Sequence, residues 1–167
     1  MSSESDRPSS DHLHMGAVQF FDLSMPYLSQ GQVSEYRALG ESLSVMMKIY
    51  SSGGENRMHK HPEEDHCFIV LEGEATFEIE SSENKTVVEQ HQGVLLPRGT
   101  SYRFMSSSER CLVMLRIGSP GKPPKRALYP DGSQKVSAME PTASLTPVRA
   151  AGGFALSAKR SDPGGAV

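Results

Sequence analysis

The chain has 167 residues, which is enough for one domain with a substantial buried core. Its formal net charge of −3 argues against general nucleic-acid binding, so we expect no nucleic-acid partner. No apolar run approaches the roughly 18 residues of a membrane span, and residues 1–15 lack the apolar core of a signal peptide, so we expect a cytoplasmic protein without a membrane partner.

The first forty residues carry weak patterns. Residues 1–15 are rich in Ser, Asp and His, and we expect them to be disordered. Residues 18–23 are compatible with a short edge strand, and residues 34–38 with a turn of helix.

A clear period of two begins at residue 43. Apolar side chains stand at every second position, at Leu43, Val45, Met47 and Ile49, and alternate with Ser42, Ser44, Met46 and Lys48. This alternation is typical of a half-buried strand. Further strand patterns follow at residues 67–71, 75–79, 85–89, 94–96, 102–104 and 111–117. Many short strands with turns between them and no long helix predict an all-β sandwich or barrel.

The composition changes after residue 117. Seven of the eleven prolines lie beyond residue 118, and no internal repeat is visible. We therefore predict one barrel over residues 16–140, followed by a Pro/Gly-rich, disordered tail over residues 141–167.

Three histidines dominate the segment before the central strands. His59 and His61 are one residue apart, so on a strand they point to the same face. Residues 62–65 form a polar turn, His66 opens an apolar run over residues 67–71, and Gly73 then closes this strand into another turn. If the two strands pair, three imidazoles converge, and neutral imidazole is the commonest protein ligand of transition metals.

These residues resemble the first motif of the cupin superfamily, which has a glycine, five residues, His-x-His, three or four residues, a glutamate, six residues and a glycine. Gly53, His59, His61 and Gly73 fall on that pattern, and His66 takes the place of the glutamate. With the shorter spacing Asp65 would be the candidate, but Gly73 would then lose its place.

A second stretch resembles the second cupin motif, which has a glycine, five residues, Pro-x-Gly, two residues and a histidine. Pro97 and Gly99 match it, whereas His91 replaces the first glycine and Tyr102 replaces the metal-binding histidine. The resemblance spans roughly residues 40–117 and implies a double-stranded β-helix, or jelly-roll barrel.

The resemblance implies one divalent metal ion, with iron expected first and zinc, nickel, manganese or copper as alternatives. The expected ligands are His59, His61, His66 and Tyr102. Because this set holds no carboxylate, the metal would keep its positive charge and favour an anionic or chelating small-molecule substrate. We expect a dioxygenase-like, metal-dependent enzyme. A metal-dependent lyase, isomerase or cyclase and a non-enzymatic small-molecule-binding cupin remain alternatives.

Tyr102 has three roles open to it: a metal ligand, a catalytic proton donor, or an aromatic side chain that fills the barrel. The acidic residues 63–65 are expected in a solvated turn, and His91 in an exposed one. A substrate carboxylate has three candidate partners, Arg98, Arg103 and Arg116. A homodimer is compatible with the sequence.

Overall fold

The computed structural model describes residues 16–119 and 146–155, and these residues form eleven β-strands and no helix. The all-β class predicted from the sequence is therefore confirmed for the described chain. The strands are β1 (Ser24–Gln30), β2 (Gln32–Leu39), β3 (Ser44–Tyr50), β4 (His59–Lys60), β5 (Asp65–Glu72), β6 (Glu74–Ile79), β7 (Lys85–Glu89), β8 (Gly93–Leu96), β9 (Ser101–Ser106), β10 (Leu112–Ser119) and β11 (Val148–Ala155).

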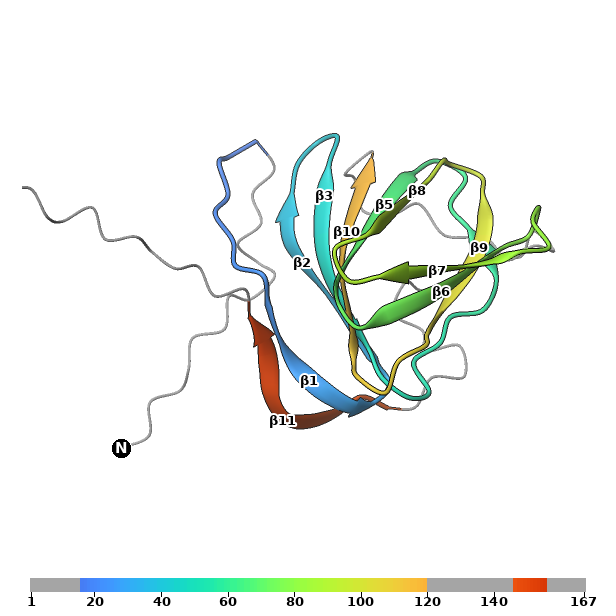
Figure 1. Cartoon of the computed structure of the whole chain (residues 1–167). Coiled ribbons are helices and arrows are strands. Elements are labelled where there is room, and N and C mark those ends of the chain that lie inside the picture. The colour runs from blue at the N-terminus through green and yellow to red at the C-terminus, as the bar shows by residue number, and fades with distance from the viewer. Residues whose placement is uncertain (1–15, 120–145, 156–167) are drawn as a thin grey trace, which may run out of the picture.

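Two sheets face each other and form the barrel (Figure 1). The larger has the order β2-β3-β10-β5-β8, and the smaller has the order β4-β9-β6-β7. All recorded pairings within them are antiparallel. From β3 to β6 and again from β7 to β10, each strand lies in the other sheet from the strand before it, and this crossing closes the interior on which the candidate site depends.

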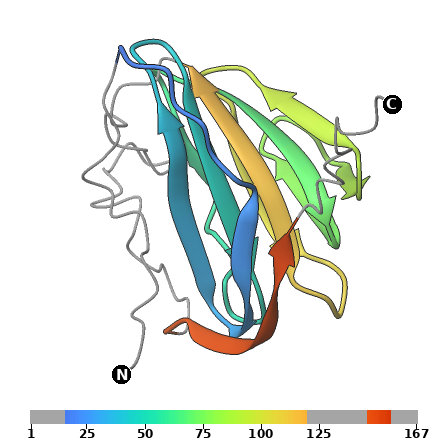
Figure 2. The ribbon, with the colours of Figure 1, turned by 90° about the vertical axis from the view of Figure 1, so that its left-hand side faces the viewer.

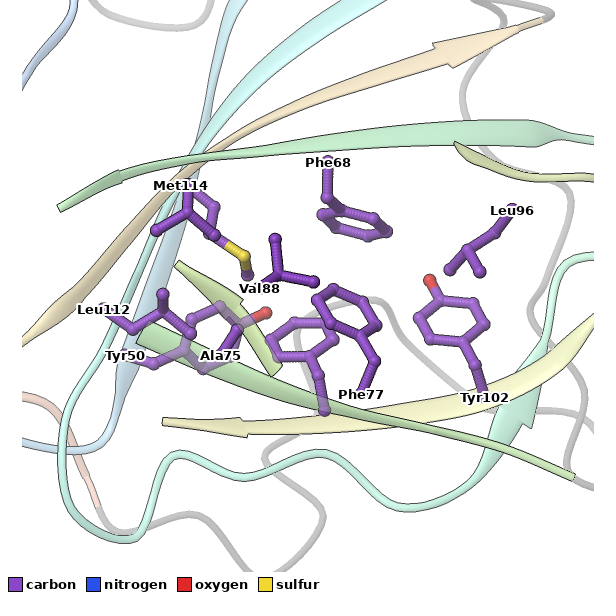
Figure 3. Close-up of a cluster of buried hydrophobic side chains, with 11 residues drawn as sticks. Tyr50, Phe68, Ala75, Phe77, Val88, Leu96, Tyr102, Leu112 and Met114 are labelled. Atoms are coloured by element: carbon purple, nitrogen blue, oxygen red, sulfur yellow. The ribbon is translucent and has the colours of Figure 1, made fainter. Parts of the chain in front are cut away.

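The barrel interior is an aromatic-rich cluster. Phe68 extends from β5 of the larger sheet and meets Phe77 from β6 and Tyr102 from β9 of the smaller sheet (Figure 3). The ring centroids of Phe68 lie 5.8 Å from Phe77 and 5.9 Å from Tyr102. Strand alternation explains this core, because every second residue of β5 and β6 turns inward.

A second apolar cluster lies on the outer face of the larger sheet. There β1 and β11 pair as a two-stranded sheet and cover β3 (Figure 2). Met25 of β1 and Phe154 of β11 pack with Met47 and Ile49 of β3. Because both faces of β3 are covered, neither Met46 nor Met47 is exposed, although they point to opposite faces.

Three local expectations differ from the structure. Residues 34–38 belong to strand β2, because pairing with β3 overrides a weak helical pattern. Residues 18–23 form no strand; there the Gln19 side chain donates to and accepts from the Leu39 backbone. Residues 148–155, expected in a disordered tail, form β11 and pair with β1.

Gly153 of β11 marks a close approach of two backbones. A Cβ at Gly153 would lie 2.8 Å from the Met25 carbonyl oxygen, so only glycine lets the strands come this close. The other residues expected to be disordered, 1–15, 141–145 and 156–167, lie outside the described residues.

A left-handed backbone occurs at four motif positions, namely Gly53, Gly73, His91 and Gly99. Gly73 has φ +81, and a Cβ there would lie 2.7 Å from the Cys111 carbonyl oxygen. His91 has φ +68 in the turn between β7 and β8, where the cupin motif has a glycine. Histidine tolerates this region better than most residues, and its side chain is exposed, as expected.

Candidate metal site

The histidines come from opposite sheets. Strand β4, which carries His59, pairs with β9 and not with β5, so the expected pairing of the two histidine strands does not occur. The imidazoles nevertheless meet across the barrel interior. The ring centroid of His61 lies 5.2 Å from that of His59 and 4.2 Å from that of His66.

Glu64 joins this cluster, which corrects its assignment to a solvated turn. Its side chain is buried, and its Oε2 lies 2.9 Å from His66 Nε2 and 3.7 Å from His61 Nδ1. The site therefore contains a carboxylate that the motif comparison missed. The signal was present in the alternation, because residues 64, 66, 68 and 70 share the inward face that continues through β5.

Arg116 of β10 completes the buried polar group. Its Nη2 lies 2.8 Å from Glu64 Oε2 and also contacts His66 Nε2. The other two candidate arginines lie elsewhere: Arg98 pairs with Asp65 at the surface, and Arg103 pairs with Glu78. Of the three, Arg116 is the one placed at the histidines.

Burial decides the charge of His66. Only 1% of the residue is exposed, and this desolvation lowers the pKa of its imidazole from 6.5 to about 4, with Arg116 contributing in the same direction and Glu64 opposing it. His66 is thus neutral at physiological pH. A neutral imidazole offers one nitrogen lone pair, which is the form that ligates metal ions.

Tyr102 lies against the same imidazole. Its hydroxyl is 3.1 Å from His66 Nδ1, and its ring belongs to the aromatic cluster of the barrel interior (Figure 3). Burial raises the pKa of the Tyr102 phenol above its ordinary value of 10. The side chain is therefore a neutral phenol in the metal-free protein, which can donate a proton.

The donor set fits a divalent metal ion. Ligand atoms of His61, Glu64 and His66 all lie within 4.8 Å of one another, and His59 is outside this group. Two ligand atoms that each lie about 2.1 Å from one metal ion at a right angle are about 3.0 Å apart, close to the 2.9 Å between His66 Nε2 and Glu64 Oε2.

The hydrogen bonds of His59 and His66 at Nδ1 are also compatible with metal binding through Nε2. His59 Nδ1 lies 2.8 Å from the Arg57 carbonyl oxygen, so it carries the proton and leaves the lone pair on Nε2. For His66, a proton on Nδ1 would donate to the Tyr102 oxygen and leave Nε2 as the ligand atom.

An apolar groove of about 350 Å³ opens between β7 and β8. Phe77, Val88 and Leu96 line it, and these residues also belong to the interior cluster. Neither Glu64 nor Tyr102 nor the three histidines line it, so the groove is separate from the candidate metal site.

Two facing antiparallel sheets around an interior that bears histidines define a double-stranded β-helix protein. Residues 46–118 match the family model described as the cupin domain, and the chain carries this cupin domain. The family and fold implied by the two sequence motifs are thus confirmed. Among the described residues, no helix has the length and apolar character needed to span a membrane.

The chain shares a segment of sequence with one curated protein and its fold with solved structures. A 53-residue segment is 40% identical to the uncharacterized protein YdbB of Bacillus subtilis, covering 32% of this chain and 46% of that protein; the match thus spans less than half the length of this curated relative. The Schizosaccharomyces pombe Cnp3 cupin domain is 14% identical with a TM-score of 0.50, over 56% of this chain and 67% of that one. A Klebsiella pneumoniae double-stranded β-helix protein is 17% identical with a TM-score of 0.51, over 55% and 75% of the two chains.

Proposed function

We propose that the protein is a mononuclear metal-dependent cupin enzyme of the oxygenase type, acting on a small anionic or chelating organic substrate. The observation that carries the proposal is the buried group of His61, Glu64 and His66, whose ligand atoms lie within 4.8 Å of one another. Two imidazoles and one carboxylate are a ligand combination used by non-heme iron oxygenases.

The chain's own residues would divide the work. His61, Glu64 and His66 would hold the metal, with His59 as a further ligand on the facing sheet. When bound, the metal would supply a Lewis acid with open positions for substrate and for oxygen or water. The hydrophobic walls formed by Phe68 and Phe104 would exclude bulk water from the reacting groups.

Tyr102 would act as a proton donor in this site. A proton on His66 Nδ1 makes the Tyr102 oxygen an acceptor, which leaves the phenol's own hydrogen directed elsewhere, toward a bound substrate. The raised pKa of Tyr102 favours this neutral donor over a phenolate ligand. The same features favour a second candidate, a metal-dependent lyase, isomerase or cyclase that uses Tyr102 as its acid.

Metal analysis and oxygen consumption together test the proposal. We expect protein loaded with ferrous iron under anaerobic conditions to hold one ion per chain and to consume oxygen with a member of a panel of small diketones, catechols and hydroxy acids. The variant His66→Ala should lose both properties. The matched control His91→Asn, which changes an exposed histidine in a turn, should keep both.

The outcomes separate the candidates. Substrate conversion without oxygen consumption would replace the oxygenase by the lyase or isomerase. Stoichiometric metal in His66→Ala, equal to that in the unmodified protein, would remove the proposed site altogether.

A further inference from the structure

Arg116 contacts two of the three residues of the candidate metal site. Its Nη2 lies 2.8 Å from Glu64 Oε2 and contacts His66 Nε2, and both residues belong to the group of three whose ligand atoms could hold a metal ion. An arginine side chain is always a cation and always a hydrogen-bond donor. With neutral His66 protonated on Nδ1, the imidazole lone pair and the carboxylate are both directed at one positive group.

The fold provides a specific place for this guanidinium. Gly118 is paired with His66 on the neighbouring strand, and a Cβ at Gly118 would lie 3.1 Å from Arg116 Nη2. A larger side chain would therefore press on the arginine. The Nη1 atom of Arg116 also lies 4.0 Å from the sulfur of buried Met46 on β3.

The charges of the two states differ. Without metal, Glu64 and Arg116 are a neutral buried pair, and both side chains are about 5% exposed. A divalent ion bound to Glu64 and His66 would displace the guanidinium and leave the three charges summing to +2. Among the described residues, Glu64 is the carboxylate that pairs with Arg116. A guanidinium displaced from Glu64 would be a buried charge without a partner, so it needs another anion.

We infer that Arg116 takes the place of the metal ion in the metal-free protein, and that metal binding frees its guanidinium to hold a carboxylate of the substrate. This inference rests on the proposed metal function and extends it. The metal and a carboxylate ligand then bind cooperatively, because each needs Arg116 away from Glu64. The substrate class becomes a carboxylic acid with a second, metal-chelating group.

Nickel titration by calorimetry tests the first half. Arg116→Met removes the competing cation and leaves Glu64 without its cationic partner, so nickel should bind about 10²-fold tighter than to the unmodified protein. Arg103→Met is the matched control, because it removes an arginine from its pair with Glu78 outside the site, and its nickel affinity should not change. Equal affinity in Arg116→Met and the unmodified protein, or nickel binding by neither, would overturn the inference.

Folding offers a second measurement if Arg116→Met is unfolded without metal. Nickel should then restore the β-sheet circular dichroism signal, because the metal replaces the missing cation beside Glu64. Failure of nickel to restore the fold would contradict the inference. A structural ion pair alone predicts that nickel has no such effect.

Lactate binding tests the second half. Nickel-loaded protein should bind lactate, a hydroxy acid, at least ~10-fold more tightly than metal-free protein and than nickel-loaded Arg116→Met. Equal lactate affinity in both nickel-loaded proteins would show that Arg116 does not hold the carboxylate. If these results hold and no oxygen is consumed with any substrate, the oxygenase proposal fails while the role of Arg116 stands.

Discussion

His59 and Tyr102 lie directly opposite each other in the β4–β9 ladder, with ring centroids 4.7 Å apart. His59 belongs to the first cupin motif and Tyr102 to the second, so this pairing joins the two motifs within one sheet. His66 approaches from the other sheet and meets the Tyr102 hydroxyl at 3.1 Å. The site is therefore built by the packing of two sheets, and it depends on the integrity of the whole barrel.

Replacing Glu64 by Gln should weaken divalent metal binding by at least tenfold, because the amide keeps the shape but loses the anionic oxygen. Loss of a residue that only supports a ligand costs about 10–100-fold, and loss of a direct ligand should cost no less. The change also leaves Arg116 as a buried unpaired charge, so the unfolding free energy of the metal-free protein should fall by about 3 kcal/mol. Nickel calorimetry and urea denaturation measure the two effects.

Glu63→Gln is the control, because this neighbouring carboxylate is exposed. Its metal affinity and stability should match the unmodified protein. Glu64→Gln and Arg116→Met should shift metal affinity in opposite directions, although each breaks the same ion pair. Shifts in the same direction would mean that the pair acts only in folding.

The stability of the metal-free protein should fall with acid because of His66. The pKa of this imidazole is lowered to about 4 in the folded chain and is 6.5 without the fold. Between these values the unfolded chain binds the extra proton, so the stabilising contribution is complete above about pH 6.5 and is lost as the pH falls toward 4. The loss should be on the order of 3 kcal/mol.

Urea denaturation of metal-free protein at several pH values measures this dependence. His66→Leu has no imidazole at this position, so its stability should decline less between pH 6.5 and 4. Parallel curves for the two proteins would show that His66 does not titrate abnormally.

Strand β11 should contribute to the stability of the domain. Phe154 is buried against Met25 and the outer face of β3, and Phe154→Ala should lower the unfolding free energy by about 3 kcal/mol through lost apolar contacts and a cavity. Phe20→Ala provides the comparison, because Phe20 is 96% exposed and its removal should change stability by less than about 0.5 kcal/mol. Thermal or urea unfolding measures both free energies. Equal unfolding free energies for the two variants would show that β11 is not part of the cooperative unit.

Much of the barrel was predictable because its signals are local. Alternation from residue 43 to residue 117 reports which face of each strand is buried, and Gly73 marks a turn that a side chain would obstruct. β11 was not predictable in this way. Its Ala and Gly residues resemble a flexible tail in composition, and its pairing with β1 joins segments more than one hundred residues apart.

The site was predictable only in part, for a related reason. The histidines stood out by motif spacing, but Glu64 lies two residues before the position of the motif glutamate, within a run of acidic residues. Its burial follows from extending the alternation of β5 back by one step. The sequence could not show which of Arg98, Arg103 and Arg116 lies at the histidines. That placement follows from the register of β10 against β5, which depends on long-range pairing.

Tyr102→Phe distinguishes the three roles open to Tyr102, because it removes the hydroxyl and keeps the ring in its aromatic cluster. We expect the variant to bind metal as the unmodified protein does and to lose turnover by ~10²–10⁴-fold, as for a missing general acid. A metal ligand would instead show weakened metal binding, and its ferric form would lose a phenolate absorption band. Calorimetry, steady-state kinetics on the substrate found in the screen and visible spectroscopy make these measurements. Turnover equal to that of the unmodified protein would leave Tyr102 with packing alone, and proton transfer would then have to come from a bound water or from the substrate itself.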